Sequence, residues 1–401
     1  MGPTKPAKTR APSTPVAAKP ADSLPQRATR DAQSATVTEI VLLGGLGDVG
    51  MRLVRMLLEY TNADVTTVSR RSTTASSQHN TRLHHVARDL SGSATLETSV
   101  GAITVNLTEA TNPAFAKHIV KSDGWFLETS ATPKYLDAIK AALDGEAGHG
   151  TAILCVGMAP GMTNLTAANI LAIAPSTSQI DIGVEMGMGR HYGVAATEWF
   201  LQTAGRSYPV MLDHTLHQIA PAELKRRFSF GIGCQTRPSV GYGFAEQTWI
   251  AAKSDRRLKT VRSFVALDPV WMTRGLAMSL ALGLGPAISR NARKLAKWLQ
   301  RFPSVGSTQS RLVVEGFDDA NQLTGQIRIA TGDQAEATAA MIFATIKSIL
   351  KRHEPSDRRL TTITDHLHLN EAIENLQQFL PDTKLSVKLG DGIPDQHVLS
   401  K

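Results

Sequence analysis

The sequence predicts an α/β protein in which a doubly wound parallel sheet is joined by an inserted α+β domain. Two observations lead to this expectation. Short apolar runs alternate with amphipathic helical stretches up to residue 160, which is typical of a parallel sheet covered by helices on both faces. Beyond residue 165 this alternation ends, and the length of 401 residues suits two domains.

The first 35 residues form a segment of unusual composition. They hold six of the 19 prolines, and their six basic and two acidic residues give a net charge of +4. Because such a segment buries too little apolar surface to offset its ordering entropy, we expect residues 1–35 to be a disordered basic tail. Half of the chain's net charge of +8 lies there. The remainder (8 − 4 = +4) gives no case for nucleic acid as a partner.

Residues 36–165 carry the alternating pattern. A mostly apolar run at residues 37–43 ends in glycines and predicts a buried strand. Residues 50–59 then place Leu53, Met56 and Leu57 on one face of a helix. Further strands are expected at residues 64–68, 84–86, 102–107, 125–127 and 152–156, with a helix over residues 133–143. These elements predict the parallel sheet.

The turn between the first strand and the first helix contains a glycine motif. Residues 44–50 read Gly-Gly-Leu-Gly-Asp-Val-Gly and match the pattern G-x-G-x-x-G. After a strand and at the start of a helix, this pattern indicates a Rossmann-type dinucleotide site. Gly45 would make the tight turn, Gly47 would let the backbone approach a pyrophosphate, and Gly50 would allow close helix–strand packing. The residues expected at the cofactor here are Gly45, Leu46, Gly47, Asp48, Val49 and Gly50. A glycine-rich turn without a ligand is the alternative.

The end of the second strand indicates which dinucleotide is bound. An NAD site usually has a carboxylate there for the ribose 2′-hydroxyl, but this chain reads Ser69-Arg70-Arg71. Guanidinium groups suit a 2′-phosphate as cations and as bidentate donors, so NADP is favoured. The alternative is a solvated end of a loop. Asp89 and Leu90, after the third strand, are expected near the adenine because of the topology.

Three further residues complete the expected cofactor site. Thr108 follows the fourth strand, and Pro160 and Gly161 follow the last strand of the first domain. Ligands of open α/β sheets bind at the carboxyl ends of the strands, where these residues lie. The alternative for Pro160 and Gly161 is a plain turn that crosses between domains.

Residues 166–331 are predicted to form the α+β substrate domain. Strand propensity at residues 180–186, a hairpin at residues 311–331, and helices near residues 195–203 and 290–301 support it. An amphipathic helix at residues 333–352 is expected to return to the first domain, so residues 332–401 are assigned as this helix followed by a tail.

At this point the chain resembles the saccharopine dehydrogenase-like family. The blocks that carry the resemblance are residues 44–50, residues 160–165 and, late in the chain, residues 314–316 and 332–338. The resemblance spans about residues 36–350. It implies a Rossmann domain, an inserted substrate domain, frequent dimers through that inserted domain, and hydride transfer between a nicotinamide cofactor and secondary amines. No amino-acid-carboxylate clamp can be matched, which points to a divergent member.

Hydride transfer also requires a group that gives or takes a proton. The segment Gly189-Arg190-His191-Tyr192-Gly193 follows a predicted strand and offers a cation, an imidazole and a phenol. Arg190 is the candidate for holding a substrate carboxylate, and His191 or Tyr192 for the acid/base. A polar surface loop is the alternative.

Other features give weaker indications. Two cysteines, Cys155 and Cys234, fit a reducing compartment, so a cytoplasmic protein is expected. Paired histidines at residues 214–217 and 366–368 lack a complete ligand set, so no metal is expected. The basic amphipathic stretch at residues 290–302 predicts either an ordinary helix with a solvated face, which is favoured, or contact with an anionic membrane surface.

These observations together predict an NADP-dependent oxidoreductase that acts, as a homodimer, on a small-molecule substrate. It would transfer a hydride between nicotinamide and an imine, secondary amine or carbonyl group. Because no unambiguous acid/base set stands out, a non-catalytic NADP(H)-binding sensor or interaction protein is the alternative.

Overall fold

A computed structural model describes residues 38–71, 80–92, 96–145, 148–231, 235–254, 257–352 and 359–390. The predicted tail at residues 1–35 and Cys234 lie outside these ranges. Both sheets described below belong to one unit that spans Val37–Lys401. Among the described residues, no helix has the length and apolar character that crossing a membrane requires.

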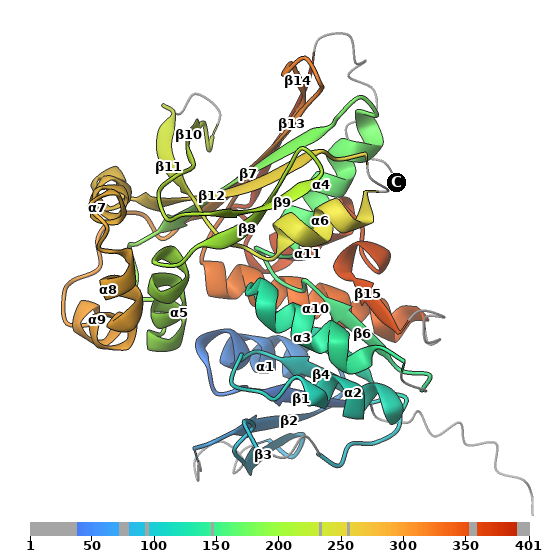
Figure 1. Cartoon of the computed structure of the whole chain (residues 1–401). Coiled ribbons are helices and arrows are strands. Elements are labelled where there is room, and N and C mark those ends of the chain that lie inside the picture. The colour runs from blue at the N-terminus through green and yellow to red at the C-terminus, as the bar shows by residue number, and fades with distance from the viewer. Residues whose placement is uncertain are drawn as a thin grey trace, which may run out of the picture. The chain divides into compact units, whose positions relative to one another are not determined.

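In the described part of the chain, seven parallel strands form the first sheet, in the order β15-β6-β5-β4-β1-β2-β3 (Figure 1). The strand order reverses beside β1, which pairs with β2 on one side and with β4 on the other. The predicted doubly wound parallel sheet is therefore confirmed. The strands are β1 (Glu39–Leu43), β2 (Asp64–Ser69), β3 (Leu83–Ala87), β4 (Ile103–Asn106), β5 (Trp125–Glu128), β6 (Thr151–Leu154) and β15 (Leu360–Thr362).

Helices cover both faces of this sheet. Alternate residues of β1 point to opposite faces, and because all of them from Ile40 to Leu43 are apolar, both faces must be buried. Ile40 and Leu42 pack into one core cluster with α1, while Val41 and Leu43 pack into a second with α2 and α3. On the first side α10 contacts both α1 and α11. The helices are α1 (Asp48–Tyr60), α2 (Ala114–Lys121), α3 (Pro133–Leu143), α10 (Gln334–Arg352) and α11 (Leu369–Phe379), with a short 3-10 helix, η1 (Ile363–Asp365), before α11.

The second sheet contains nine strands within the described residues, and it is mixed rather than parallel. β7 and β12 run parallel at its centre, while β7 and β13, and β13 and β14, are antiparallel. The hairpin predicted at residues 311–331 is β13 and β14. The strands are β7 (Gln179–Gly187), β8 (Tyr208–Leu212), β9 (Thr215–Ile219), β10 (Lys225–Phe228), β11 (Arg237–Gly241), β12 (Thr260–Asp268), β13 (Ser310–Phe317), β14 (Leu323–Thr331) and β16 (Lys384–Leu389).

The remaining helices connect or flank this second sheet. α4 follows the last strand predicted for the first domain and contacts β13 and β14, so it links the two sheets. α7, α8 and α9 follow one another along the chain and lie together at the left of Figure 1, beside α5. These helices are α4 (Met162–Ile173), α5 (Val194–Ala204), α6 (Glu246–Lys253), α7 (Val270–Ala281), α8 (Gly285–Arg290) and α9 (Ala292–Leu299).

The sequence pattern predicts no strands between residues 204 and 268, yet β8 to β12 lie there. β9 explains the omission, because four of its five residues are exposed and it has no apolar alternation. The chain after residue 332 also contributes to both sheets, with β15 beside β6 and β16 beside β14.

Candidate functional site

The carboxyl ends of β1 and β4 mark the place where open α/β sheets bind ligands, because the strand order reverses between them. The glycine turn at residues 44–50 begins there and leads into α1. The backbone N–H of Gly44 donates to the carbonyl of Val68 on β2 at 2.8 Å, and that of Gly45 donates to the carbonyl of Leu42 at 3.1 Å. These hydrogen bonds fix the turn against the sheet.

The three glycines of the motif stand in different surroundings. A Cβ on Gly50 would lie 2.4 Å from the carbonyl oxygen of Gly45, and a Cβ on Gly45 would lie 2.8 Å from a methyl of Thr67. A Cβ on Gly47 would have one neighbour within 4 Å, the Gly44 oxygen at 3.3 Å. Gly45 and Gly50 are therefore required by packing, whereas Gly47 is exposed beside the helix N-terminus and less crowded.

The other turn residues differ in exposure. Leu46 and Val49 are half-buried, while Asp48 is exposed at the first position of α1. The first N–H groups of a helix have no intrahelical acceptors, so this end of α1 presents donors to an anion.

The turn after β2 holds its backbone firmly and exposes its cations. The hydroxyl of Ser69 accepts a hydrogen bond from the backbone N–H of Arg71 at 3.3 Å, and the Arg71 carbonyl lies 2.7 Å from Nε2 of His85. Arg70 and Arg71 are both exposed, and neither forms an ion pair with a described residue. The structure therefore leaves both guanidinium groups available next to the glycine turn.

The residues after β3 lie next to this turn. Asp89 is exposed, and its hydrogen bonds from Ser91, together with the charge of Arg70, lower the pKa of its carboxyl. Leu90 is buried, and its carbonyl accepts a hydrogen bond from Asn112 at 3.0 Å.

Thr108 packs directly on the glycine turn, whereas Pro160 and Gly161 are buried. A Cβ on Gly44 would lie 3.0 Å from the methyl group of Thr108. Gly161 has a φ of 135°, and a Cβ there would lie 1.9 Å from the Gly157 oxygen, so the start of α4 requires a glycine. In this structure Pro160 and Gly161 shape the turn before α4, and both expose little surface.

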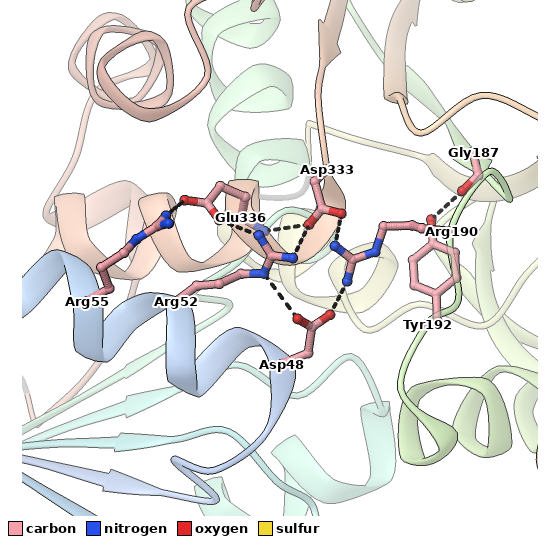
Figure 2. Close-up of polar contacts among 8 residues, drawn as sticks. All are labelled: Asp48, Arg52, Arg55, Gly187, Arg190, Tyr192, Asp333 and Glu336. Atoms are coloured by element: carbon pink, nitrogen blue, oxygen red, sulfur yellow. Dashed lines mark hydrogen bonds and ion pairs between the residues drawn. The ribbon is translucent and has the colours of Figure 1, made fainter. Parts of the chain in front are cut away.

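A group of arginines and carboxylates joins the glycine turn to the second sheet region (Figure 2). It draws its members from the start of α1, from the loop after β7 and from the N-terminus of α10. We call it the arginine–carboxylate cluster, and it consists of Asp48, Arg52, Arg55, Arg190, Asp333 and Glu336.

Arg190 occupies the middle of this cluster. Its guanidinium forms ion pairs with Asp48 and with Asp333, and its side chain is 24% exposed. Arg52 reaches the same two carboxylates at 3.1 and 3.6 Å and also pairs with Glu336. Burial lowers the pKa of Arg52, but the three carboxylates outweigh it and raise that pKa above its ordinary value. Three cations and three anions thus balance at the contact between α1, α10 and the β7–α5 loop.

The two predicted acid/base residues differ in their exposure and hydrogen bonding. His191 is exposed. The hydroxyl of Tyr192 donates a hydrogen bond to the carbonyl of Gly187 at 2.9 Å (Figure 2). Burial raises the pKa of Tyr192 to about 12, so the phenol keeps its proton at neutral pH.

A buried carboxyl group lies at the same edge of the first sheet, at the end of β5. Glu128 is 1% exposed, and its oxygens accept hydrogen bonds from the amide of Asn106 and from the backbone N–H of Ser130, both at 2.7 Å. The Asn106 amide also lies 3.1 Å from the hydroxyl of Tyr135. Burial raises the pKa of Glu128 to about 8, although both hydrogen bonds lower it. The group is therefore mostly protonated at pH 7.

A second buried carboxyl, that of Glu246, lies at the start of α6. Ser263 donates a hydrogen bond to it at 3.1 Å, and burial raises its pKa to about 7. Burial also raises the pKa of the Cys155 thiol, so this cysteine is not a nucleophile. Among the described residues, no group of three or more His, Cys, Asp or Glu side chains could hold a metal ion.

Sequence patterns alone do not indicate Glu128, Asp333 or Glu336 as site residues. Glu128 could have been noticed because it ends a predicted apolar strand on the ligand-binding edge. Asp333 and Glu336 lie in the late block that carries the family resemblance, but nothing in their spacing shows that they would contact Arg190 and Arg52.

No protein-family model matches this chain, and no curated protein matches it in sequence. Among solved structures, it is similar to an engineered D-amino acid dehydrogenase bound to NADP⁺, with a TM-score of 0.42, 12% identity and coverage of 83% of this chain and 95% of that one. It is also similar to the C. glutamicum DAP dehydrogenase in complex with DAP, with a TM-score of 0.42, 12% identity and coverage of 83% and 94%.

A third similar structure is the dipicolinate-bound dihydrodipicolinate reductase from Paenisporosarcina sp. TG-14. Its TM-score is 0.37 and its identity 8%, with coverage of 82% of this chain and all (100%) of that one. The fold assignment itself rests on the strand order of the first sheet.

Proposed function

We propose that this protein binds NADP(H) at the carboxyl edge of the first sheet and acts as an NADP-dependent oxidoreductase. One observation carries the proposal. The glycine turn at residues 44–50 lies where the strand order reverses, and it opens α1. This is the position at which a Rossmann-type sheet holds the pyrophosphate of a dinucleotide.

The exposure of Gly47 and the N-terminus of α1 support the pyrophosphate site. Unpaired backbone N–H groups and the positive end of the helix dipole both favour an anion there. Leu46 and Val49 would flank it. Asp48 is the one acidic group of the turn, and its charge is balanced by Arg52 and Arg190.

The choice of NADP rests on Arg70 and Arg71. Both are exposed at the end of β2, beside the turn, and their backbone is fixed by Ser69. The ribose of a dinucleotide on the glycine turn lies at the end of the second strand, so its 2′-phosphate would meet these cations. Asp89 and Leu90 would lie on the adenine side, and Thr108, Pro160 and Gly161 toward the nicotinamide side.

The chemistry proposed is hydride transfer between nicotinamide and an imine, a secondary amine or a carbonyl group. The resemblance to the saccharopine dehydrogenase-like family supports this substrate class. Arg190 would exchange one of its carboxylate partners for an anionic group of the substrate. His191 would give or take the proton because it is exposed, while Tyr192 would keep its proton and shape the loop.

A non-catalytic NADP(H) sensor is the second candidate, and one observation favours it. The Arg190 guanidinium is already paired with Asp48 and Asp333, and the Tyr192 hydroxyl is already hydrogen-bonded to Gly187. Two of the three predicted catalytic side chains, those of Arg190 and Tyr192, are therefore engaged in contacts within the protein in this structure.

The test is a fluorescence titration of the full chain with NADPH and with NADH. The wild type should bind NADPH more tightly. The double variant Arg70→Ala/Arg71→Ala should lose roughly tenfold or more in NADPH affinity for each guanidinium, because a hydrogen bond to a charged group contributes about 1.5–3 kcal/mol. Binding of NADH should not change.

The exposed Lys140→Ala on α3 is the matched control, and it should bind both nucleotides as the wild type does. An equal loss of NADPH and NADH in the double variant would refute the 2′-phosphate assignment. Absence of binding by either nucleotide in the wild type would refute the function. Tight NADPH binding without oxidation in the presence of imines or carbonyl compounds would favour the sensor.

A further inference from the structure

The helices α7, α8 and α9 expose an unusual amount of apolar surface. Thirteen large hydrophobic side chains are exposed in the described part of the chain, and eight of them lie between residues 271 and 305. Trp271 and Met278 are each 63% exposed, Leu282 is 71% exposed and Trp298 is 51% exposed. Scattered exposed side chains are ordinary, but a concentration of this kind marks a contact surface.

The exposed side chains of α7 follow helical spacing. Trp271, Met278 and Leu282 stand at positions i, i+7 and i+11, which places them in one stripe along the helix. The rings of Trp298, on α9, and Phe302, just after its end, pack edge to face with their centroids 4.4 Å apart, and both are exposed. The exposed apolar side chains thus form a stripe along α7 and an aromatic pair at the end of α9.

The charge of the same segment is of one sign only. Residues 269–309 contain six basic residues and no Asp or Glu. Lys294, Lys297 and Arg301 are exposed, and helical spacing places Lys294 and Arg301 beside Trp298. Arg274 borders the stripe on α7 and also lines a cavity of about 360 Å³ with Lys225 and Arg227.

We propose that the α7–α9 surface, residues 270–305, binds the anionic surface of a lipid bilayer without crossing it. Exposed Trp, Phe and Leu side chains would enter the boundary between headgroups and acyl chains, and the neighbouring Lys and Arg would lie at the anionic headgroups. This reverses the preference of the sequence analysis for a solvated helix at residues 290–302, because the structure leaves the apolar side chains uncovered as well.

A second copy of this chain is a poorer occupant of the surface. A symmetric dimer brings the same patch of both copies together, so Lys294, Lys297 and Arg301 of one copy would face the same cations of the other. The segment holds no carboxylate to pair with them. An anionic bilayer supplies both the apolar interior and the counter-charge.

The test is co-sedimentation of the full chain with vesicles of equal parts phosphatidylcholine and phosphatidylserine, and with vesicles of phosphatidylcholine alone. The protein should bind the mixed vesicles, bind the neutral ones far more weakly, and be released by high salt. Lys294→Gln/Lys297→Gln/Arg301→Gln should weaken binding by about a hundredfold, since each cation near such a surface contributes about fivefold.

Matched control variants test whether the loss of binding is specific to the α7–α9 surface or follows from removing any exposed cation or apolar side chain. Lys134→Gln/Lys140→Gln/Lys384→Gln removes three exposed cations elsewhere and should leave binding within a few-fold of the wild type. Trp298→Ser should reduce binding at least tenfold, whereas Leu216→Ser, which changes an equally exposed side chain on β9, should not.

Two results would overturn the proposal. One is the failure of the wild-type chain to bind the mixed vesicles. The other is an equal loss in the control and test variants. Light scattering on the same samples identifies the competing occupant. If Trp298→Ser turned a dimer into a monomer while vesicles bound neither form, the surface would be a contact between two copies. None of these results depends on NADP(H) binding.

Discussion

Replacing Glu128 by Gln should flatten the dependence of stability on pH. The ordinary pKa of the carboxyl is 4.5, and burial at the end of β5 raises it to about 8 in the folded protein. The folded state therefore holds this proton more tightly than the unfolded state does. Its contribution to stability is fully present below pH 4.5 and is lost as the pH rises toward 8, where the folded protein must also ionise the group.

The size of the effect follows from the two pKa values. One pKa unit corresponds to about 1.4 kcal/mol, so between pH 5 and pH 8 the wild type should lose about 3.5 kcal/mol of unfolding free energy through this group. Gln cannot ionise, and its side-chain oxygen can still accept a hydrogen bond from Asn106 or Ser130. Glu128→Gln should therefore lack this loss.

The assay is urea unfolding followed by far-ultraviolet circular dichroism at several pH values between 5 and 8. Glu246 is present in both proteins and its contribution cancels in the comparison. Glu374→Gln, on the exposed side of α11, is the control and should keep the wild-type slope. Parallel curves for the wild type and Glu128→Gln would show that the carboxyl is not held protonated by burial.

Four other substitutions have specific expected results. Gly50→Ala should lower both the melting temperature and NADPH affinity, because its Cβ would meet the Gly45 oxygen at 2.4 Å, whereas Gly47→Ala should keep the wild-type melting temperature and lose NADPH affinity alone. Gly161→Ala should lose on the order of 3 kcal/mol of unfolding free energy in urea, since its Cβ meets backbone and its φ is 135°. Arg190→Ala should raise the KM for whichever substrate the enzyme converts more than it lowers kcat. An unchanged KM would show that Arg190 does not bind the substrate.

The parts of the fold that follow from local sequence are those with one clear periodic signal. The helix predicted at residues 133–143 has the bounds of α3, because Pro133 starts it and apolar side chains recur at helical spacing. On α1, the apolar spacing predicts one buried face, and its residues Leu53, Met56 and Leu57 are all buried. The glycine turn follows from the sequence for the same reason, since the spacing of its glycines is a local pattern.

The parts that do not follow are those decided by contacts between distant residues. The arginine–carboxylate cluster joins Asp48 to Arg190, 142 positions apart in the chain. No pattern near Arg190 shows that carboxylates would occupy it, so the sequence favours a free substrate-binding cation there. The strand β15 is only three residues long, and it joins the first sheet through pairing with β6, which no local signal reveals.

The burial of Glu128 is a third case of this kind. A glutamate at the end of a strand is normally solvated. The pKa of Glu128 is raised because the folded chain buries its carboxyl, although the hydrogen bond from Asn106 lowers it. The exposed apolar stripe on α7 is the opposite case. Its composition is that of a core helix, and only the folded arrangement of the described residues shows that Trp271, Met278 and Leu282 are exposed.

A crystal structure of the complex with NADPH tests the central claim most directly. We expect the pyrophosphate against Gly47 at the N-terminus of α1, with the 2′-phosphate between the guanidinium groups of Arg70 and Arg71. It also predicts the nicotinamide on the side of Thr108, toward the loop that carries Arg190. A cofactor bound elsewhere, or a 2′-phosphate that touches neither arginine, would contradict it.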